Sequence, residues 1–307
     1  MSDSFSEIFR PKNPKQLIGE TQRKVAQSLL DNVTQGKIIQ EVLFSGDSGI
    51  GKTTIARMYI STVLGYEYDG YLFNCGDKTG VDYIREEVIG TINYLPLDSN
   101  YRIYFLDEIH KLTDAAQNSL LVAIEPVPAH VLFVCCTTEP SKLIKTLRSR
   151  LTEYRLSPPS FSDFEILSKW ICKKEDKIID DKLRDQAISL AGGNVRQFVR
   201  YLQQTFEGTF NGFEEENRPE ISLIKLIISG NKDLGKWLNS VDESGELTRQ
   251  AMGMVGYSLS VLKNGSSNHK AAKAVVKYFG DNPTRNIVDK YTFYNRLLAV
   301  YEEISFH

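Results

Sequence analysis

The stretch "GDSGIGKTTIA", residues 46–56, decides the fold. Gly46 to Thr53 fit the pattern G-x-x-x-x-G-K-[ST] without a gap, between a predicted strand and a predicted helix. Glycines let the backbone curl so that successive N–H groups point at one anion, and the start of a helix adds partial positive charge. The alternative is a chance glycine-rich turn. With the strand and the helix both in place, the motif predicts a loop that binds the phosphates of a nucleotide.

The motif also names the residues that would hold the nucleotide. We expect Lys52 to reach the β- and γ-phosphates of ATP and Thr53 to place its hydroxyl on Mg²⁺. The residues expected to bind the cofactor ATP in this loop are Gly46, Asp47, Ser48, Gly49, Ile50, Gly51, Lys52, Thr53 and Thr54.

A pair of carboxylates ends another apolar run, "RIYFLDEIH" at residues 102–110. Ligands of open α/β sheets gather at the carboxyl ends of the strands, so we expect this pair beside the phosphate loop. Asp107 is the expected metal partner, through a water molecule. Glu108 is the expected base, or the group that orients the attacking water. An acidic strand end that caps the next helix is the alternative, and His110 is interpreted as the tail of the motif rather than as a catalytic residue.

Apolar runs alternate with helical patterns through the first half of the chain. Helical segments begin at Lys52, near Val81 and near Thr113. Near-continuous apolar runs are typical of strands that are buried on both faces, as in a parallel sheet. The pattern predicts βαβ units and an α/β fold with a doubly wound sheet. The expected strands are "EVLFS" (41–45), "YLFNC" (71–75), "RIYFLD" (102–107) and "VLFVCCTT" (131–138).

Two interruptions divide the rest of the chain. "SPPS" (157–160) breaks the alternation with two prolines, and helical patterns follow it. "EGTFNGFEEENRPE" (207–220) is polar, acidic and rich in turn residues, and the remainder is expected to be helical with a loop at 264–268. The expected domains are an α/β core at 1–157, a small helical domain at 158–210 and a terminal helical domain at 211–307.

Composition narrows the class of protein. Of the 307 residues, 41% are hydrophobic and 25% charged, which is ordinary for a globular protein with buried cores. No apolar run approaches the roughly 18 residues that cross a bilayer, and the first residues lack the apolar segment of a secretory signal. The four cysteines form no C-x-x-C pair, which indicates a reduced, intracellular protein without a zinc site. Since the net charge is −2, any DNA contact would need a local basic surface.

Three longer segments, together with the two motifs, resemble the clamp-loader ATPases of the AAA+ superfamily. "EIFRPKNPKQLIGE" (7–20) is similar to the N-terminal box of that family, and residues 74–88 to the segment before its second core helix. Residues 107–143 are the most similar stretch and cover the Walker B box, the next helix and the sensor-1 strand. The resemblance extends from residue 7 to about 205. It implies an AAA+ P-loop core with a helical lid, followed by an all-α C-terminal collar.

The resemblance also implies roles for single residues. Arg10, Pro11 and Ile18 would border the adenine of ATP. Thr138 would be sensor 1, in contact with the γ-phosphate or the attacking water, with Thr137 as its nearest competitor.

Two arginines take roles from the same resemblance. The box that usually reads Ser-Arg-Cys is Ser149-Arg150-Leu151 here, so Arg150 would be an arginine finger that acts in trans, with Arg148 in reserve. Arg196, in "GGNVRQFVRYL" (192–202), would be the sensor-2 arginine that reaches over the nucleotide from the lid; a solvated helix face is the alternative.

The resemblance finally implies partners. They are a sliding clamp, other clamp-loader subunits in a pentameric ring, and primer-template DNA bound without regard to sequence, in the cytoplasm or nucleoid (the host cytoplasm if the chain is viral) and not at a membrane. Candidate DNA contacts are Arg85, with ordinary surface charge as its alternative, and the helix starts at 79–81 and 113–115. Candidate clamp contacts are Tyr94 and Leu95, with core packing as their alternative. Lys270, Lys273 and Lys277 are interpreted as a solvated stripe.

Two other classes of function stay open. One is a different AAA+ DNA motor, such as a branch-migration or recombination factor or a helicase loader. The other is a clamp-loader scaffold subunit that does not hydrolyse ATP. The intact Lys52, Asp107 and Glu108 argue against the scaffold.

Overall fold

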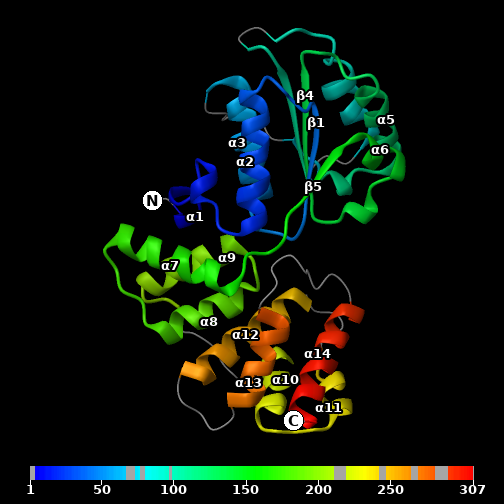
Figure 1. Cartoon of the computed structure of the whole chain (residues 1–307). Helices are drawn as coiled ribbons and strands as arrows, with labels where there is room; N and C mark the ends of the chain where they lie inside the picture. The colour runs from blue at the N-terminus through cyan, green and yellow to red at the C-terminus, as the bar shows by residue number, and fades with distance from the viewer. Residues whose placement is uncertain are drawn as a thin grey trace. The chain divides into compact units, whose positions relative to one another are not determined.

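The protein was analysed as a computed structural model, shown in Figure 1. The structure describes residues 4–66, 73–76, 80–96, 99–210, 219–241, 247–263, 269–280 and 290–306. The chain divides into two compact units. A sheet unit comprises residues 11–17 and 21–156, and a helical unit comprises residues 1–10, 18–20 and 157–307.

The sheet unit is built on five strands in the order β2-β3-β4-β1-β5. Each strand runs parallel to its neighbours, so all carboxyl ends lie at one edge. Residues Val131–Thr137 of the central strand β4 are all buried, as their apolar run predicts. The strands are β1 (Glu41–Ser45), β2 (Phe73–Asn74), β3 (Arg102–Asp107), β4 (Val131–Thr137) and β5 (Thr152–Arg155).

Helices cover both faces of this sheet (Figure 1). Helices α2 (Glu20–Thr34) and α3 (Lys52–Leu64) pack on one face, against Val42, Phe44 and other strand residues. The opposite face, which includes Leu43 and Tyr104, packs against the remaining helices. Successive strand side chains point to opposite faces, which explains why alternate residues join different cores. The remaining helices are α4 (Val81–Tyr83), which continues as a π-helix over Ile84–Ile89, α5 (Asp114–Ile124) and α6 (Lys145–Arg150).

Short elements complete the sheet unit and the N-terminus. Helix α1 (Phe5–Ile8) belongs to the helical unit, where the Phe5 ring contacts Phe206. Single 3₁₀ turns lie within the segments 7–20 and 107–143, at Pro14–Gln16 (η1), Ile109–Lys111 (η3) and Pro140–Lys142 (η4).

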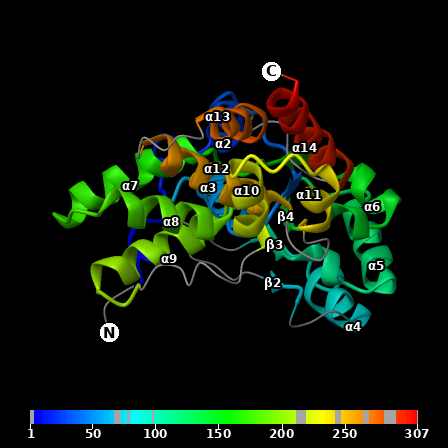
Figure 2. The ribbon, with the colours of Figure 1, turned by 90° about the horizontal axis from the view of Figure 1, so that it is seen from below.

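The helical unit has one continuous apolar core, to which both halves of the unit contribute. Phe164 and Phe198 come from the segment before residue 211, and Trp237 and Phe293 come from the segment after it. Helix α12 packs against α8, α10 and α13 (Figure 2). The helices are α7 (Phe161–Glu175), α8 (Asp181–Ala191), α9 (Val195–Phe206), α10 (Pro219–Ile228), α11 (Leu234–Asn239), α12 (Leu247–Lys263), α13 (His269–Val275), the π-helix Val276–Gly280 (η6) and α14 (Lys290–Ser305).

The structure confirms the expected fold class, a P-loop parallel sheet followed by helices. The division between Leu156 and Ser157 lies beside the predicted boundary at 157/158. The further boundary at 210/211 stays a prediction, and the lid and the C-terminal helices share their core. Strand β5 was not expected, because its four residues are too polar to stand out as an apolar run. Residues 71–72 of an expected strand and the expected loop at 264–268 lie outside the described residues.

Candidate nucleotide-binding site

The phosphate loop connects β1 to α3 and depends on glycine at two positions. Gly46 has φ +137°, and a Cβ there would lie 2.5 Å from the Leu156 carbonyl oxygen and 2.8 Å from Ile50 Cδ1. Gly51 precedes α3 with φ +105°. Side chains are strained at such angles, so both positions require glycine. No side chain caps the first turn of α3, so its N–H groups are available to an anion.

Lys52 lies in the first turn of α3, beneath the loop. Its Nζ donates to the carbonyl oxygens of Gly46 and Asp47, each at 2.7 Å. Burial lowers the pKa of Lys52, and the nearby Asp107 and Glu108 oppose that shift. Burial likewise raises the pKa of Asp47, against the pull of Lys52. The ammonium group is therefore held by loop carbonyls within a site that carries negative charge.

The two predicted metal ligands lie together. Thr53 Oγ1 donates a hydrogen bond of 3.1 Å to Asp107 Oδ2, which joins the first turn of α3 to the end of β3. A hydroxyl and a carboxylate oxygen are ligands that Mg²⁺ prefers, and Mg²⁺ is commonly held by one or two such groups together with substrate phosphates. The glycine cradle, the uncapped helix start and this oxygen pair fit ATP and Mg²⁺.

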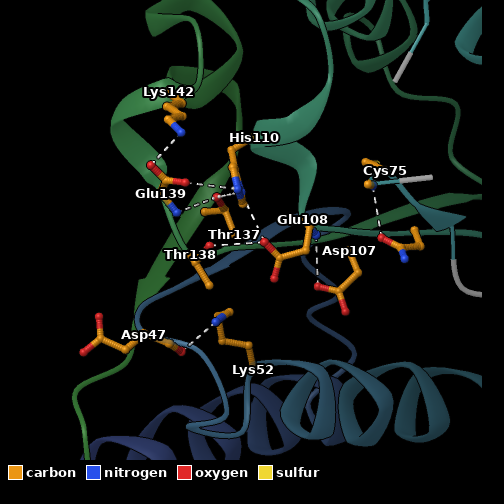
Figure 3. A network of polar contacts seen from close by, with 12 residues as sticks. Asp47, Lys52, Cys75, Asp107, Glu108, His110, Thr137, Thr138, Glu139 and Lys142 are labelled. Atoms are coloured by element: carbon orange, nitrogen blue, oxygen red, sulfur yellow. Dashed lines mark hydrogen bonds and ion pairs between the residues drawn. The ribbon is translucent and has the colours of Figure 1, made fainter. Parts of the chain in front are cut away.

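Glu108 follows the last residue of β3 and has an unusual backbone. Its φ is +54°, in the left-handed region that residues other than glycine seldom adopt, and its N–H donates to Asp107 Oδ1 at 3.0 Å. This conformation turns the Glu108 side chain toward the end of β4. There Thr138 Oγ1 donates to Glu108 Oε2 at 3.1 Å, so the predicted base and the predicted sensor-1 residue are in direct contact (Figure 3).

His110 lies at the centre of a polar network behind Glu108 (Figure 3). Its Nδ1 is 3.0 Å from Thr137 Oγ1 and 3.4 Å from Glu108 Oε2, and its Nε2 is 3.4 Å from Glu139 Oε1. Glu139 in turn pairs with Lys142 at 2.8 Å. Burial lowers the pKa of His110, and the two carboxylates oppose that shift. Thr137 thus faces His110, whereas Thr138 faces Glu108.

The structure gives partners to both arginines of the predicted finger segment. Arg150, at the end of α6, pairs with Glu125 at 2.6 Å, and Arg148 pairs with Glu153 at 2.8 Å. Sequence reasoning missed Glu125 as a partner of Arg150, because the two residues lie 25 positions apart along the chain. About half of the Arg150 side chain is exposed, so it is accessible to another molecule.

Four predicted nucleotide contacts divide between the two units. Pro11 belongs to the sheet unit, whereas Arg10, Ile18 and Arg196 belong to the helical unit. Arg10 pairs with Glu7 at 2.6 Å, and Ile18 packs against the core of the helical unit. Arg196 lies exposed in the first turn of α9, after the N-cap Asn194. Their contacts with ATP stay predictions.

The candidate DNA and clamp contacts are on the surface of the sheet unit. Arg85 is exposed and lies 3.5 Å from Asp82, and Thr113 caps α5 by accepting from Ala116 N–H. Thr79 lies outside the described residues. Tyr94 and Leu95 are 63% and 70% exposed, so neither is a core residue. The lysines of the predicted solvated stripe, Lys270, Lys273 and Lys277, are also exposed, and Lys277 pairs with Glu303.

Parts of the chain are similar in sequence to known proteins. A family model described as DNA polymerase III, delta subunit, matches residues 71–160. The DNA polymerase III subunit gamma of Buchnera aphidicola is 28% identical over 234 residues, which cover 69% of this chain and 64% of that protein. The replication factor C small subunit of Methanococcus vannielii is 31% identical over 206 residues, which cover 66% of this chain and 64% of that protein.

The chain is similar in sequence to clamp-loader ATPase subunits, and its fold is that of AAA+ proteins. It spans less than two thirds of the length of these relatives. The Thermotoga maritima RuvB Holliday junction branch migration motor matches in structure with a TM-score of 0.51 and 19% identity, covering 84% of this chain and 91% of that one. This second likeness shows the AAA+ fold alone. Within the described ranges, no helix of this AAA+ chain is long and apolar enough to cross a bilayer.

Proposed function

We propose that this AAA+ chain is an ATPase subunit of a sliding-clamp loader. The observation that carries the proposal is the gathering of Lys52, Thr53, Asp107, Glu108 and Thr138 at the carboxyl ends of β1, β3 and β4. A scaffold subunit that binds without hydrolysis has no need of a base and a polar partner beside the metal ligands.

The described residues support a division of labour in hydrolysis. Thr53 and Asp107 would hold Mg²⁺, which would neutralise charge on the β- and γ-phosphates. Lys52 leaves the carbonyls of Gly46 and Asp47 for the phosphates, where its charge is needed. Glu108 orients the attacking water and accepts its proton, and Thr138 positions the γ-phosphate or that water.

The second part of the proposal concerns the ring. Arg150 would leave Glu125 and reach the γ-phosphate bound by a neighbouring subunit. An exposed ion pair contributes only about 0–1 kcal/mol, so releasing Arg150 from Glu125 costs little. An arginine finger supplied by a neighbour contributes on the order of 10³–10⁵ in rate in other phosphoryl-transfer systems.

The relatives named as DNA polymerase III gamma and replication factor C small subunit support the wider role. In this role the chain assembles with other loader subunits into a pentameric ring that opens a sliding clamp and grips primer-template DNA. ATP binding organises the ring, and hydrolysis releases the clamp. Arg85 and the start of α5 would contact DNA phosphates, and Tyr94 and Leu95 would contact the clamp.

Three substitutions test the chemistry. Lys52→Ala should weaken ATP binding, because it removes the charge that meets the phosphates. Glu108→Gln should bind ATP but not hydrolyse it, because the amide keeps the shape and cannot accept the water's proton. Thr53→Val should raise the Mg²⁺ concentration needed for half-maximal hydrolysis. Filter binding and phosphate release measure these effects, and normal turnover by Glu108→Gln would refute the role of Glu108.

A mixing experiment tests the ring. Arg150→Ala should leave ATP affinity nearly intact in the isolated chain and abolish stimulated hydrolysis in the assembled complex. Complexes that contain both Arg150→Ala and Lys52→Ala should recover part of the activity, because the Lys52→Ala subunit keeps its arginine finger although its own nucleotide site is inactive. If mixing restores nothing in complexes whose assembly is confirmed by sizing, Arg150 acts within its own subunit or is structural, and Arg148 becomes the candidate.

A further inference from the structure

We infer that His110 is a positioning residue for Glu108, an inference that rests on the proposed role of Glu108 as the base. The imidazole fixes the carboxylate from the side away from the phosphate loop, through Nδ1 at 3.4 Å from Glu108 Oε2. Figure 3 shows the ring between Glu108 and Glu139, with Thr137 beside it. The sequence had suggested only that His110 ends the Walker B motif.

The ring itself is firmly held. The His110 side chain is 5% exposed, and it follows Ile109, which is fully buried in the core beneath β3 and β4. Thr137 Oγ1 lies 3.0 Å from Nδ1 and also accepts the Glu139 N–H at 3.1 Å, so the hydroxyl is anchored to the backbone after β4. A group fixed in this way can orient a neighbouring side chain.

Glu108 needs such a partner because its other partner has a competing role. Thr138 donates its hydroxyl proton to Glu108 Oε2 in this structure. A threonine hydroxyl has one O–H donor, so Thr138 cannot donate to Glu108 and to a γ-phosphate together. When Thr138 turns to the nucleotide, the contact with His110 is what keeps Glu108 oriented.

The two nitrogens of His110 face different groups, which makes the inference testable. Nδ1 faces Glu108 and Thr137, whereas Nε2 faces Glu139, which is nearly half exposed and already paired with Lys142. A carboxylate only accepts hydrogen bonds, so Glu108 is served by the tautomer with the N–H on Nδ1, where Glu108 Oε2 at 3.4 Å shares that N–H with Thr137 Oγ1 at 3.0 Å. An asparagine places its amide near the position of Nδ1, and a glutamine reaches the position of Nε2.

The test compares His110→Phe, His110→Asn and His110→Gln in the full chain, assembled with its partner subunits. His110→Phe keeps a ring and removes both nitrogens. It should bind ATP within about threefold of the unaltered protein and hydrolyse it about 100-fold more slowly, the loss expected for a misplaced catalytic group. His110→Asn should retain more of the hydrolysis rate than His110→Gln. Glu139→Gln is the matched control and should change the rate less than about threefold.

Single-turnover hydrolysis and ATP affinity are measured separately, with thermal unfolding as a check on folding. Full-rate hydrolysis by His110→Phe would overturn the inference, as would equal rates for the Asn and Gln variants, which remain informative if the Phe variant does not fold. A loss in Glu139→Gln as large as that in His110→Phe would also overturn it. Glu108→Gln is measured alongside: if that variant hydrolyses ATP normally, the proposed function itself fails, whereas an inactive Glu108→Gln beside an active His110→Phe refutes only the role of His110.

Discussion

Replacing Gly46 by alanine tests the geometry of the phosphate loop with a single methyl group. The added Cβ would lie 2.5 Å from the Leu156 carbonyl oxygen, a backbone atom, and 2.8 Å from Ile50 Cδ1. Leu156 is itself tied to the sheet, because its N–H donates to the Ser45 carbonyl at 2.8 Å. The loop must therefore move rather than its neighbour, and nucleotide affinity should fall with stability.

A second glycine supplies a control for the backbone angle. Gly36 has φ +74°, and a Cβ there would meet nothing within 4 Å. Gly36→Ala should therefore destabilise the folded state only by the cost of an alanine in the left-handed region, about 1–2 kcal/mol. A gain of about 0.4–1 kcal/mol, from the lower conformational entropy of the unfolded chain, offsets part of this cost. Gly46→Ala adds overpacking of about 1–3 kcal/mol, for a total of about 1–5 kcal/mol.

The assay is urea unfolding followed by far-UV circular dichroism, with ATP binding measured by calorimetry. Both tryptophans, Trp170 and Trp237, lie in the helical unit, so their fluorescence would not report on the loop directly. We expect a lower midpoint and weaker ATP binding for Gly46→Ala than for Gly36→Ala. Equal midpoints and equal affinities for the two variants would refute the reasoning.

The remaining predictions concern the helical unit. Gly256→Ala should lower the free energy of unfolding by about 1–3 kcal/mol. Its Cβ would lie 1.9 Å from Ser189 Oγ, so the buried hydroxyl must turn away from the Asp185 carbonyl that it now bonds at 2.8 Å. Urea unfolding by tryptophan fluorescence measures this, and an unchanged midpoint would contradict the packing. Arg184→Met should lower the free energy of unfolding by about 3–5 kcal/mol, because it removes a buried guanidinium that pairs with Asp185 at 2.7 Å. A loss below about 1 kcal/mol in the same assay would show that this pair is not an important stabilising contact.

Much of the sheet unit could be predicted from the sequence. Strands at 41–45 and 102–107 and the helix from Lys52 lie where the apolar runs and the glycine loop placed them. Parallel topology then brings Asp107 to the loop, because the carboxyl ends of all five strands share one edge. Strand β5 could not be predicted, since it has only four residues, of which the two outer ones are exposed and the two middle ones only partly buried.

The contacts between side chains were harder to predict. Spacing identifies Glu108 and His110 as part of a motif, but the left-handed backbone of Glu108 decides which groups it faces. The pairing of Arg150 with Glu125 depends on the packing of α6 beside α5, which no local pattern encodes. Likewise, the shared core of the helical unit joins segments that a polar stretch separates in the sequence.

The central claim is that ATP hydrolysis by this chain serves the loading of a clamp. The most direct measurement is the steady-state ATPase rate of the complex purified with its natural partner subunits, with and without the sliding clamp and primer-template DNA. The account predicts that clamp and DNA together raise the rate, and that Lys52→Ala and Arg150→Ala abolish the increase. An ATPase rate that is unchanged by the clamp and primer-template DNA, or that rises with a four-way DNA junction instead, would contradict the account and favour another AAA+ DNA motor.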